Sequence, residues 1–269
     1  MAIHSSAIVE DGAKLGAGVE IGPFSFVART VTLADGVRLA SHVSVVGHTE
    51  IGARTVVHPH AALGGEGQIR KNDFAEARLV IGQDNVIRES VTMSCGSRKD
   101  AGITRVGNDG YFMAYSHVGH DCVVGDGCTF ANSVALGGHV HVGDNVIIGG
   151  NTAVQQFCRV GRMAMVGGLT GVNRDIIPFG IAFGDHAVLG GLNLIGLKRR
   201  GLPRETINAL RGAYRAIFRG TAGHIPDRAL AAKKNWAGIP EVQELADFIL
   251  ADAKQSICTA RVRGESGEE

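Results

Sequence analysis

The chain has 269 residues, of which 39 are glycine and only 5% are aromatic, while 27 Lys and Arg balance 26 Asp and Glu. The net charge of +1 lacks the basicity typical of nucleic-acid binding, and no apolar stretch approaches the roughly 20 residues of a membrane helix. The glycine content is about twice the average, yet proline is scarce and low-complexity sequence is absent, which argues against disorder. The composition therefore favours a repeat fold with tight corners.

An apolar residue recurs every six positions over residues 3–63, 81–93 and 106–172. Neither the helical period of 3.6 nor strand alternation produces a period of six, whereas a short strand followed by a corner does. Three such units make one triangular coil of 18 residues, and the coils stack at about 4.8 Å. The prediction is a mainly β fold, a left-handed parallel β-helix of hexapeptide repeats. Glycine follows the apolar residue in 13 of the 26 repeats, where we expect positive-φ or crowded corner conformations.

Two interruptions and a change of period divide the chain. Residues 64–79 and 96–105 leave the repeat and are expected to form loops, which in solenoids often carry function. We assign residues 1–190 to the β-helix domain and 191–263 to a small all-α C-terminal domain. The helical pattern predicts one helix from Pro203 to Gly220, a second over 226–236 and a third over 240–260. Residues 264–269 are expected to be a disordered tail.

The cysteines and the N-terminus indicate a cellular location. The chain has five cysteines, an odd number, and none of them has CxxC spacing. The first residues carry neither the charged nor the apolar region of a secretory signal. We therefore expect reduced thiols in a cytoplasmic protein, mostly in core positions, with a catalytic cysteine as the less favoured alternative.

The 18-residue coil also predicts which residues lie beside one another on neighbouring coils. His120, Gly138 and Gln156 are 18 apart, and Asp121 and His139 begin the adjacent column. A neutral histidine can take a proton from a hydroxyl group. A glycine one coil away can present its backbone N–H to an oxyanion, because it lets a substrate approach the main chain. The columns therefore predict general-base catalysis of acyl transfer at His120 and Gly138.

Metal binding is the alternative interpretation of the same region. Four of the eleven histidines fall within 25 positions, namely His117, His120, His139 and His141. Some β-helix carbonic anhydrases hold zinc with three histidines from neighbouring subunits. However, ligands must converge near 2 Å from the metal, and His117 and His120 occupy different parts of a hexad. The spacing therefore disfavours a metal site.

Four segments carry a resemblance to a known family. Residues 116–125 read SHVGHDCVVG, residues 136–139 LGGH, residues 149–158 GGNTAVQQFC and residues 193–202 NLIGLKRRGL. The chain resembles the acyl-[acyl-carrier-protein]–UDP-N-acetylglucosamine O-acyltransferases, which start lipid A synthesis, over nearly its whole length. The resemblance implies that His120 is the general base for the sugar 3-hydroxyl, with Asp121 as its electrostatic partner. Gly138 would supply the N–H of the oxyanion hole.

The resemblance also implies a set of substrate-binding residues. These are Gln68, Lys71, His117, His139, Gln156, Gly168, His186, Asn193, Arg199 and Arg200. The arginines and Asn193 are expected near the nucleotide or its phosphates, because the arginine fork suits phosphate. Gly168 is expected where the family measures acyl length, and without a side chain it would admit a longer chain.

The implied partners are acyl carrier protein, a UDP-sugar and two further copies of the chain in a homotrimer. No metal or other cofactor is implied, because the acyl chain arrives on the phosphopantetheine of the carrier protein. Basic residues of the first C-terminal helix and the Lys198–Arg200 run are expected either to dock the acidic carrier or to form a solvated face. Nucleic acid and a transmembrane segment are not expected.

Four positions depart from the family pattern near the expected sugar-nucleotide site. Ile69 and Ile195 stand where the family usually has acidic residues, and Ser94 and Gln155 stand where it usually has histidine. A lost carboxylate removes an acceptor for sugar hydroxyls. The departures leave open an acyltransferase for a different UDP-amino sugar or a non-catalytic sugar-nucleotide-binding paralogue, although intact His120 and Gly138 argue against the latter.

Overall fold

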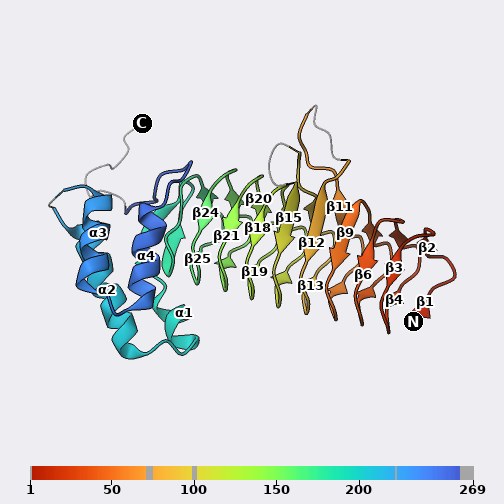
Figure 1. The fold of residues 1–269 in the computed structure, drawn as a ribbon, viewed down its shortest axis with the longest axis horizontal. Helices are drawn as coiled ribbons and strands as arrows, with labels where there is room; N and C mark the ends of the chain where they lie inside the picture. Colours follow the sequence, from red (N-terminus) through yellow and green to blue (C-terminus); the bar gives the residue numbers. More distant parts are fainter. Residues whose placement is uncertain (1, 71–74, 99–101, 222, 261–269) are drawn as a thin grey trace.

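The computed structural model describes residues 2–70, 75–98, 102–221 and 223–260, which form a long three-sided prism with helices at one end (Figure 1). Most strands have two residues, recur every six residues and pair in parallel with the strand one coil away. The second residue of each short strand is the apolar residue of a hexad. Its side chain points into the prism, as for Val27, Leu33 and Leu63, which are at most 1% exposed. The hexapeptide β-helix prediction is therefore confirmed.

Each face of the prism is one sheet. The first face contains β1 (Ala2–Ile3), β4 (Glu20–Ile21), β7 (Arg38–Leu39), β10 (Val56–Val57), β13 (Val86–Ile87), β16 (Tyr111–Phe112), β19 (Thr129–Phe130), β22 (Ile147–Ile148), β25 (Met165–Val166), β27 (Gly180–Phe183) and β28 (Val188–Leu192). The second contains β2 (Ile8–Val9), β5 (Phe26–Val27), β8 (Ser44–Val45), β11 (Ala62–Gly65), β14 (Thr92–Ser94), β17 (His117–Val118), β20 (Ala135–Leu136), β23 (Ala153–Val154) and β26 (Gly171–Val172). The third contains β3 (Lys14–Leu15), β6 (Thr32–Leu33), β9 (His48–Ile51), β12 (Arg78–Ile81), β15 (Ile103–Val106), β18 (Val123–Val124), β21 (His141–Val142) and β24 (Arg159–Val160). Next to the helical end, β27 and β28 pair antiparallel.

The glycines that follow the apolar residues are required by space. A Cβ at Gly22, for example, would lie 2.7 Å from the carbonyl carbon of Ala40 in the next coil. Of the 13 glycines, all of which lie in the described ranges, only Gly64 has a positive φ. Residues other than glycine fill most of the left-handed corner positions. His42, for example, has a φ of 58° and His139 a φ of 59°. The expectation of positive-φ or crowded corners is thus met by crowding, and a positive φ accompanies it only at Gly64.

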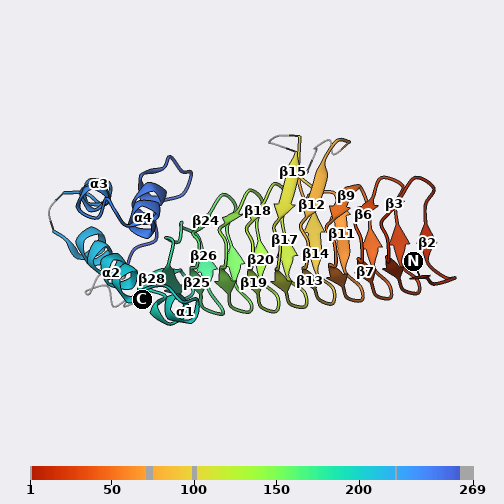
Figure 2. The ribbon, with the colours of Figure 1, turned by 60° about the horizontal axis from the view of Figure 1, so that its bottom comes forward.

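Both predicted loops are shorter than expected. The segments before β12 and before β15 leave the prism at the same edge (Figures 1 and 2). Strand β11 extends to Gly65 and β12 begins at Arg78, so the predicted loop 64–79 was too long at both ends. Strand β15 begins at Ile103, inside the predicted loop 96–105, because its first residues pair with β12. Residues 71–74 and 99–101 of these loops lie outside the described residues.

The C-terminal helices are α1 (Leu194–Arg199), α2 (Arg204–Arg219), α3 (Ile225–Asn235) and α4 (Pro240–Leu250). Two predicted helices correspond to α2 and α3, while α1 was not predicted. The third prediction, over 240–260, was wrong beyond Leu250, because Ala251 is extended and Ile257 forms a β-bridge with Asp175. The division at residue 190 stays a prediction, and the predicted tail 264–269 lies outside the described residues. None of the helices in the described part of the chain is long and apolar enough to cross a bilayer.

Arg159, which pairs with the buried Asp175, joins the prism to the helices through Phe248. The Arg159 Nε donates to Asp175 Oδ2 at 2.7 Å, and Asp175 is 0% exposed. The same guanidinium donates to the backbone carbonyl of Phe248 in α4 at 3.1 Å and lies 4.3 Å from the centre of its ring. The helical end is thereby fixed against the last coils of the prism.

All five cysteines are free and buried, which confirms their expected core positions. Burial raises the pKa of every one of these thiols, to about 12 at Cys122 and Cys158 and to about 11 at Cys128 and Cys258. Only the thiolate is a strong nucleophile. The structure therefore disfavours a catalytic cysteine.

Candidate active site

A cavity of about 480 Å³ lies on the second face of the prism, against β17, β20 and β23. It brings together five of the predicted site residues. Its lining is Gln68, Ser94, His117, Gly119, His120, Ala135, Leu136, Gly137, Gly138, Ala153, Val154, Gln155 and Gln156. Gln68 comes from the segment before β12, and the other lining residues come from the coils themselves. The cavity is therefore formed mainly by a rigid, hydrogen-bonded surface.

The stacking of coils places His120 directly beside Gly138. Strands β17 and β20 pair with His117 opposite Ala135, and His120 and Gly138 each lie three residues further on. A Cβ on Gly138 would lie 2.3 Å from Cε1 and 2.4 Å from Nε2 of His120. Any side chain at this position would occupy the space of the imidazole. Glycine is therefore required here by the histidine.

The backbone N–H of Gly138 is available to a ligand. The N–H groups on either side pair with neighbouring coils, since Gly137 donates to Val154 and His139 donates to His120. The N–H of Gly138 has no protein acceptor among the described residues. Gly138 itself lines the cavity beside the ring of His120. This is the arrangement that stabilises a developing oxyanion next to a proton acceptor.

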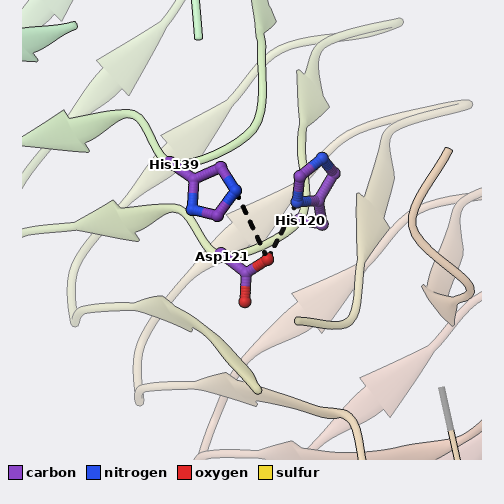
Figure 3. A group of neighbouring side chains, drawn as sticks. All are labelled: His120, Asp121 and His139. Carbon is purple, nitrogen blue, oxygen red and sulfur yellow. Dashed lines mark hydrogen bonds and ion pairs between the residues drawn. The ribbon is translucent and has the colours of Figure 1, made fainter. Parts of the chain in front are cut away.

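The carboxylate of Asp121 lies behind His120 and is 2% exposed (Figure 3). Its Oδ2 is 2.9 Å from Nδ1 of His120. Ser97 donates to both carboxylate oxygens, from its backbone N–H to Oδ1 at 2.8 Å and from its hydroxyl to Oδ2 at 2.6 Å. Because the carboxylate accepts these hydrogen bonds, Nδ1 of His120 donates to it and Nε2 keeps its lone pair. The pair is arranged as a base supported by a buried carboxylate.

His139 lies beside this pair but does not line the cavity. Its ring meets that of His120 edge to face at 5.0 Å, and its Nε2 is 3.9 Å from Asp121 Oδ2. Phe157, one coil further, stacks on His139 at 4.6 Å, and Lys254 lies 3.8 Å above the Phe157 ring. His139 is thus packed into the column that supports the site. Its predicted contact with substrate stays a prediction.

His117 lines the cavity as a neutral ring. Burial, and secondarily the proximity of His120, lowers its pKa. Its Nδ1 is 2.7 Å from the hydroxyl of Thr92, on the preceding coil. A lowered pKa keeps the imidazole uncharged at neutral pH, where it can exchange hydrogen bonds with a sugar.

A second group of predicted residues lies elsewhere. Asn193, Arg199 and Arg200 line a cavity of about 800 Å³ on the first face, together with Ile147 of β22 and Met165 of β25. The Asn193 side chain accepts from the N–H of Gly196 at 3.1 Å and therefore caps α1.

The remaining predicted residues lie outside both cavities. His186 is exposed in the turn between β27 and β28. Gly168 adjoins Gly150, since a Cβ there would lie 3.2 Å from the Gly150 carbonyl oxygen. Lys71 lies outside the described residues. The geometry therefore separates the predicted substrate residues into two groups on different faces.

Two of the four departures from the family pattern lie in the first cavity. Ser94 and Gln155 line it, whereas Ile195 lines the second cavity with a 68% exposed side chain. Ile69 follows the lining residue Gln68 in the chain. Two of the changes therefore line the same cavity as His120, one adjoins it in the chain, and Ile195 lies on another face of the prism.

The residues that hold Asp121 were not predicted from the sequence. Ser97 belongs to an interruption of the repeat, so the 18-residue column does not predict its position. Thr104, whose hydroxyl accepts from the Asp121 N–H at 2.8 Å, also follows that interruption. The one feature of the sequence that pointed to Ser97 and Thr104 was the position of the interruption, close to the histidine cluster.

The same cluster contains the atoms that a metal ion would use. His120, Asp121 and His139 offer ligand atoms within 4.8 Å of one another, the one such group in the described ranges. The Asp121 oxygens, however, already accept three hydrogen bonds, two from Ser97 and one from His120. This favours a hydrogen-bonded base over a metal centre.

Comparisons with known proteins decide the family. The family described as UDP N-acetylglucosamine O-acyltransferase, domain 2, matches residues 175–258. A relative from Caulobacter vibrioides is 50% identical over 258 residues, which are 96% of this chain and 98% of the relative. One from Sinorhizobium fredii is 43% identical over 265 residues, 98% of this chain and 97% of the relative. Both are named acyl-[acyl-carrier-protein]–UDP-N-acetylglucosamine O-acyltransferase.

The chain belongs to this acyltransferase family. Solved structures agree with the assignment. LpxA from Acinetobacter baumannii has a TM-score of 0.92 at 36% identity, and the UDP-N-acetylglucosamine acyltransferase from Campylobacter jejuni has 0.91 at 33%. Each comparison covers 96% of this chain and all of the solved one. The predicted class, a left-handed parallel β-helix with a small helical C-terminal part, is confirmed.

Proposed function

We propose that this member of the O-acyltransferase family transfers a 3-hydroxyacyl chain from acyl carrier protein to the 3-position of UDP-N-acetylglucosamine. This is the first step of lipid A biosynthesis. The observation that carries the proposal is the contact of His120 with Gly138, whose N–H is available beside the ring. The donor brings its own phosphopantetheine, so the enzyme needs no cofactor of its own. The free, reduced thiols support a cytoplasmic location.

The geometry supports a direct transfer mechanism. Nε2 of His120 takes the proton of the sugar 3-hydroxyl while that oxygen attacks the thioester carbonyl. The carbonyl oxygen becomes an oxyanion and accepts a hydrogen bond from the N–H of Gly138. Collapse of the intermediate breaks the carbon–sulfur bond, and protonated His120 returns its proton to the departing thiolate. Asp121 stabilises the charged imidazole between the two proton transfers.

The separation of the two cavities supports a homotrimer. His120 lies on the second face of the prism, whereas Arg199 and Arg200 lie on the first. One copy therefore does not present both groups to the same ligand. If the arginines hold the nucleotide phosphates, as we propose, the first face of one copy must approach the second face of another. A closed ring of three copies satisfies this heterologous contact.

This shared site predicts complementation between inactive variants. His120→Ala and Arg200→Ala homotrimers are each expected to be nearly inactive. After mixing, unfolding and refolding, hybrid trimers will contain sites with both native residues, and activity should rise about tenfold or more above either parent. The measurement is the rate of acyl transfer by the refolded mixture, with each variant refolded alone as control. No gain in a mixture shown by mass to contain hybrid trimers would contradict the shared site.

Basic residues of the helical end are proposed to dock the carrier protein. Lys198, Arg204 and Arg211 surround a further cavity of about 500 Å³ beside α1 and α2. Acyl carrier protein is acidic, so opposite charges favour this encounter. The cavity adjoins the cavity of Arg199 and Arg200 through Leu194, which lines both. The donor would thus be delivered next to the proposed nucleotide site.

A different acceptor sugar is the second candidate, favoured by Ser94 and Gln155 in the lining of the cavity. Mass spectrometry of products from a panel of UDP-sugars and acyl carrier proteins tests both candidates. UDP-N-acetylglucosamine as the preferred acceptor supports the first, whereas preference for a 3-amino sugar, acylated as an amide, supports the second. Sugar-nucleotide binding without turnover would indicate a non-catalytic paralogue. Activity that depends on a metal found in the purified protein would instead indicate the metal site.

A further inference from the structure

The interruption before β15 reaches back to the carboxylate of Asp121. Ser97, at the start of the interruption, is 0% exposed and gives both of its donors to this one carboxylate. Thr104, in β15 after the interruption, is also 0% exposed, and its hydroxyl accepts from the Asp121 N–H at 2.8 Å. Residues from the two ends of the interruption therefore hold the backbone and the side chain of Asp121.

This arrangement departs from the hydrogen bonding of the other coils. At the equivalent corners, the N–H groups of His139 and Phe157 donate to the carbonyls of His120 and Gly138, each 19 residues earlier. The carbonyl 19 residues before Asp121 is that of Gly102, and it accepts from Arg78 instead. The interruption thus removes the usual backbone acceptor and replaces it with the hydroxyl of Thr104.

Backbone pairing fixes the position of Ser97. The N–H of Cys95 donates to the Gly65 carbonyl at 2.9 Å, and the N–H of Gly96 donates to the Arg78 carbonyl at 3.0 Å. A Cβ on Gly96 would lie 2.2 Å from the carbonyl carbon of Gly102. The two ends of the interruption are therefore packed backbone to backbone. Ser97 directly follows Gly96 in this close-packed region.

We propose that Ser97 is a positioning residue that acts on His120 through Asp121. This proposal rests on the proposed function, in which His120 is the base. Two donors from one residue, one to each oxygen, fix the plane of the carboxylate. The fixed carboxylate holds the proton of His120 on Nδ1 and leaves the lone pair of Nε2 beside Gly138. Without the Ser97 hydroxyl, only the backbone N–H of residue 97 still donates to the carboxylate, at Oδ1. Oδ2, the oxygen that faces Nδ1 of His120, is then no longer held, and neither is the tautomer of the imidazole.

The kinetic test compares two buried serines. Ser97→Ala is expected to lower kcat by about 10- to 100-fold, a part of what a general base contributes, and to change both KM values by less than about twofold. Ser25→Ala is the matched control, because Ser25 is 1% exposed and its hydroxyl donates to the Ala40 carbonyl and accepts from the Val43 N–H, so this variant also loses buried hydroxyl hydrogen bonds. It should keep the wild-type kcat. Wild-type kcat in Ser97→Ala, or an equal loss in both variants, would overturn the proposal.

A measurement without substrate separates this proposal from the proposed function. Nitrogen NMR of histidine-labelled protein reports the tautomer of His120, assigned with His120→Ala. The ionisable groups that face this ring are Asp121, His117 and His139, all retained in the Ser97 variant. The wild type should carry the proton on Nδ1, and Ser97→Ala should show a mixture of tautomers. An unchanged tautomer would overturn the role of Ser97 even if transfer is confirmed. The predicted change would support that role even if the acceptor differs.

Discussion

His120→Ala is expected to lower kcat for acyl transfer by about 10²- to 10⁴-fold, the usual contribution of a general base. The ring lines the cavity, holds Nδ1 2.9 Å from Asp121 and leaves Nε2 beside Gly138. Alanine removes the proton acceptor and leaves the β-helix hydrogen bonds of the backbone intact. Initial rates with saturating substrates, together with calorimetry for sugar-nucleotide binding, measure the effect.

The control for this substitution is His60→Ala. His60 is an exposed corner histidine whose ring contacts only His42, at 4.9 Å, among the ring contacts of the described residues. The His60→Ala variant should retain the wild-type rate, because neither the His60 ring nor the His42 ring lines the cavity. A His120→Ala enzyme with a rate within about threefold of the wild type would reject His120 as the base.

Gly138→Ala is expected to lower kcat by about 10²- to 10³-fold, the usual effect of losing an oxyanion donor. Its Cβ would lie 2.3 Å from Cε1 of His120, so the imidazole must leave its position. The displaced ring breaks its hydrogen bond with Asp121, and the added methyl group obstructs the approach of the thioester to the N–H. One substitution thus disturbs both the base and the oxyanion hole.

Gly238→Ala provides the matched control, because a Cβ there meets nothing within 4 Å and the residue has no positive φ. Its kcat should equal that of the wild type. Thermal unfolding of both variants separates a local effect from loss of the fold. A folded Gly138→Ala enzyme that keeps the wild-type kcat would contradict the proposed oxyanion hole.

The period of six was sufficient to predict the prism. Each hexad carries the same apolar signal, and parallel pairing forces an 18-residue register, so the contact between His120 and Gly138 follows from counting residues. The helical end was less predictable. Helix α4 stops at Leu250 because the following residues pair with the prism, a tertiary contact that has no local signal.

The parts of the site that escaped prediction lie where the repeat is interrupted. Ser97 and Thr104 flank an insertion, so no count of 18 relates them to Asp121. Asn193, a predicted site residue, also caps α1 and lies on another face from His120. A single sequence gives residue types at such positions. It does not give the face of the prism that they occupy.

The role of His120 in acyl transfer is tested most directly by measuring the products of the wild-type enzyme and His120→Ala. Purified protein is mixed with UDP-N-acetylglucosamine and a 3-hydroxyacyl carrier protein, and free carrier thiol and acylated sugar nucleotide are quantified together. If His120 is the base of an acyl transfer, the wild type forms one 3-O-ester for each thiol released, and His120→Ala forms neither at an appreciable rate. Thiol release without a sugar ester, or equal ester formation by both proteins, would contradict it.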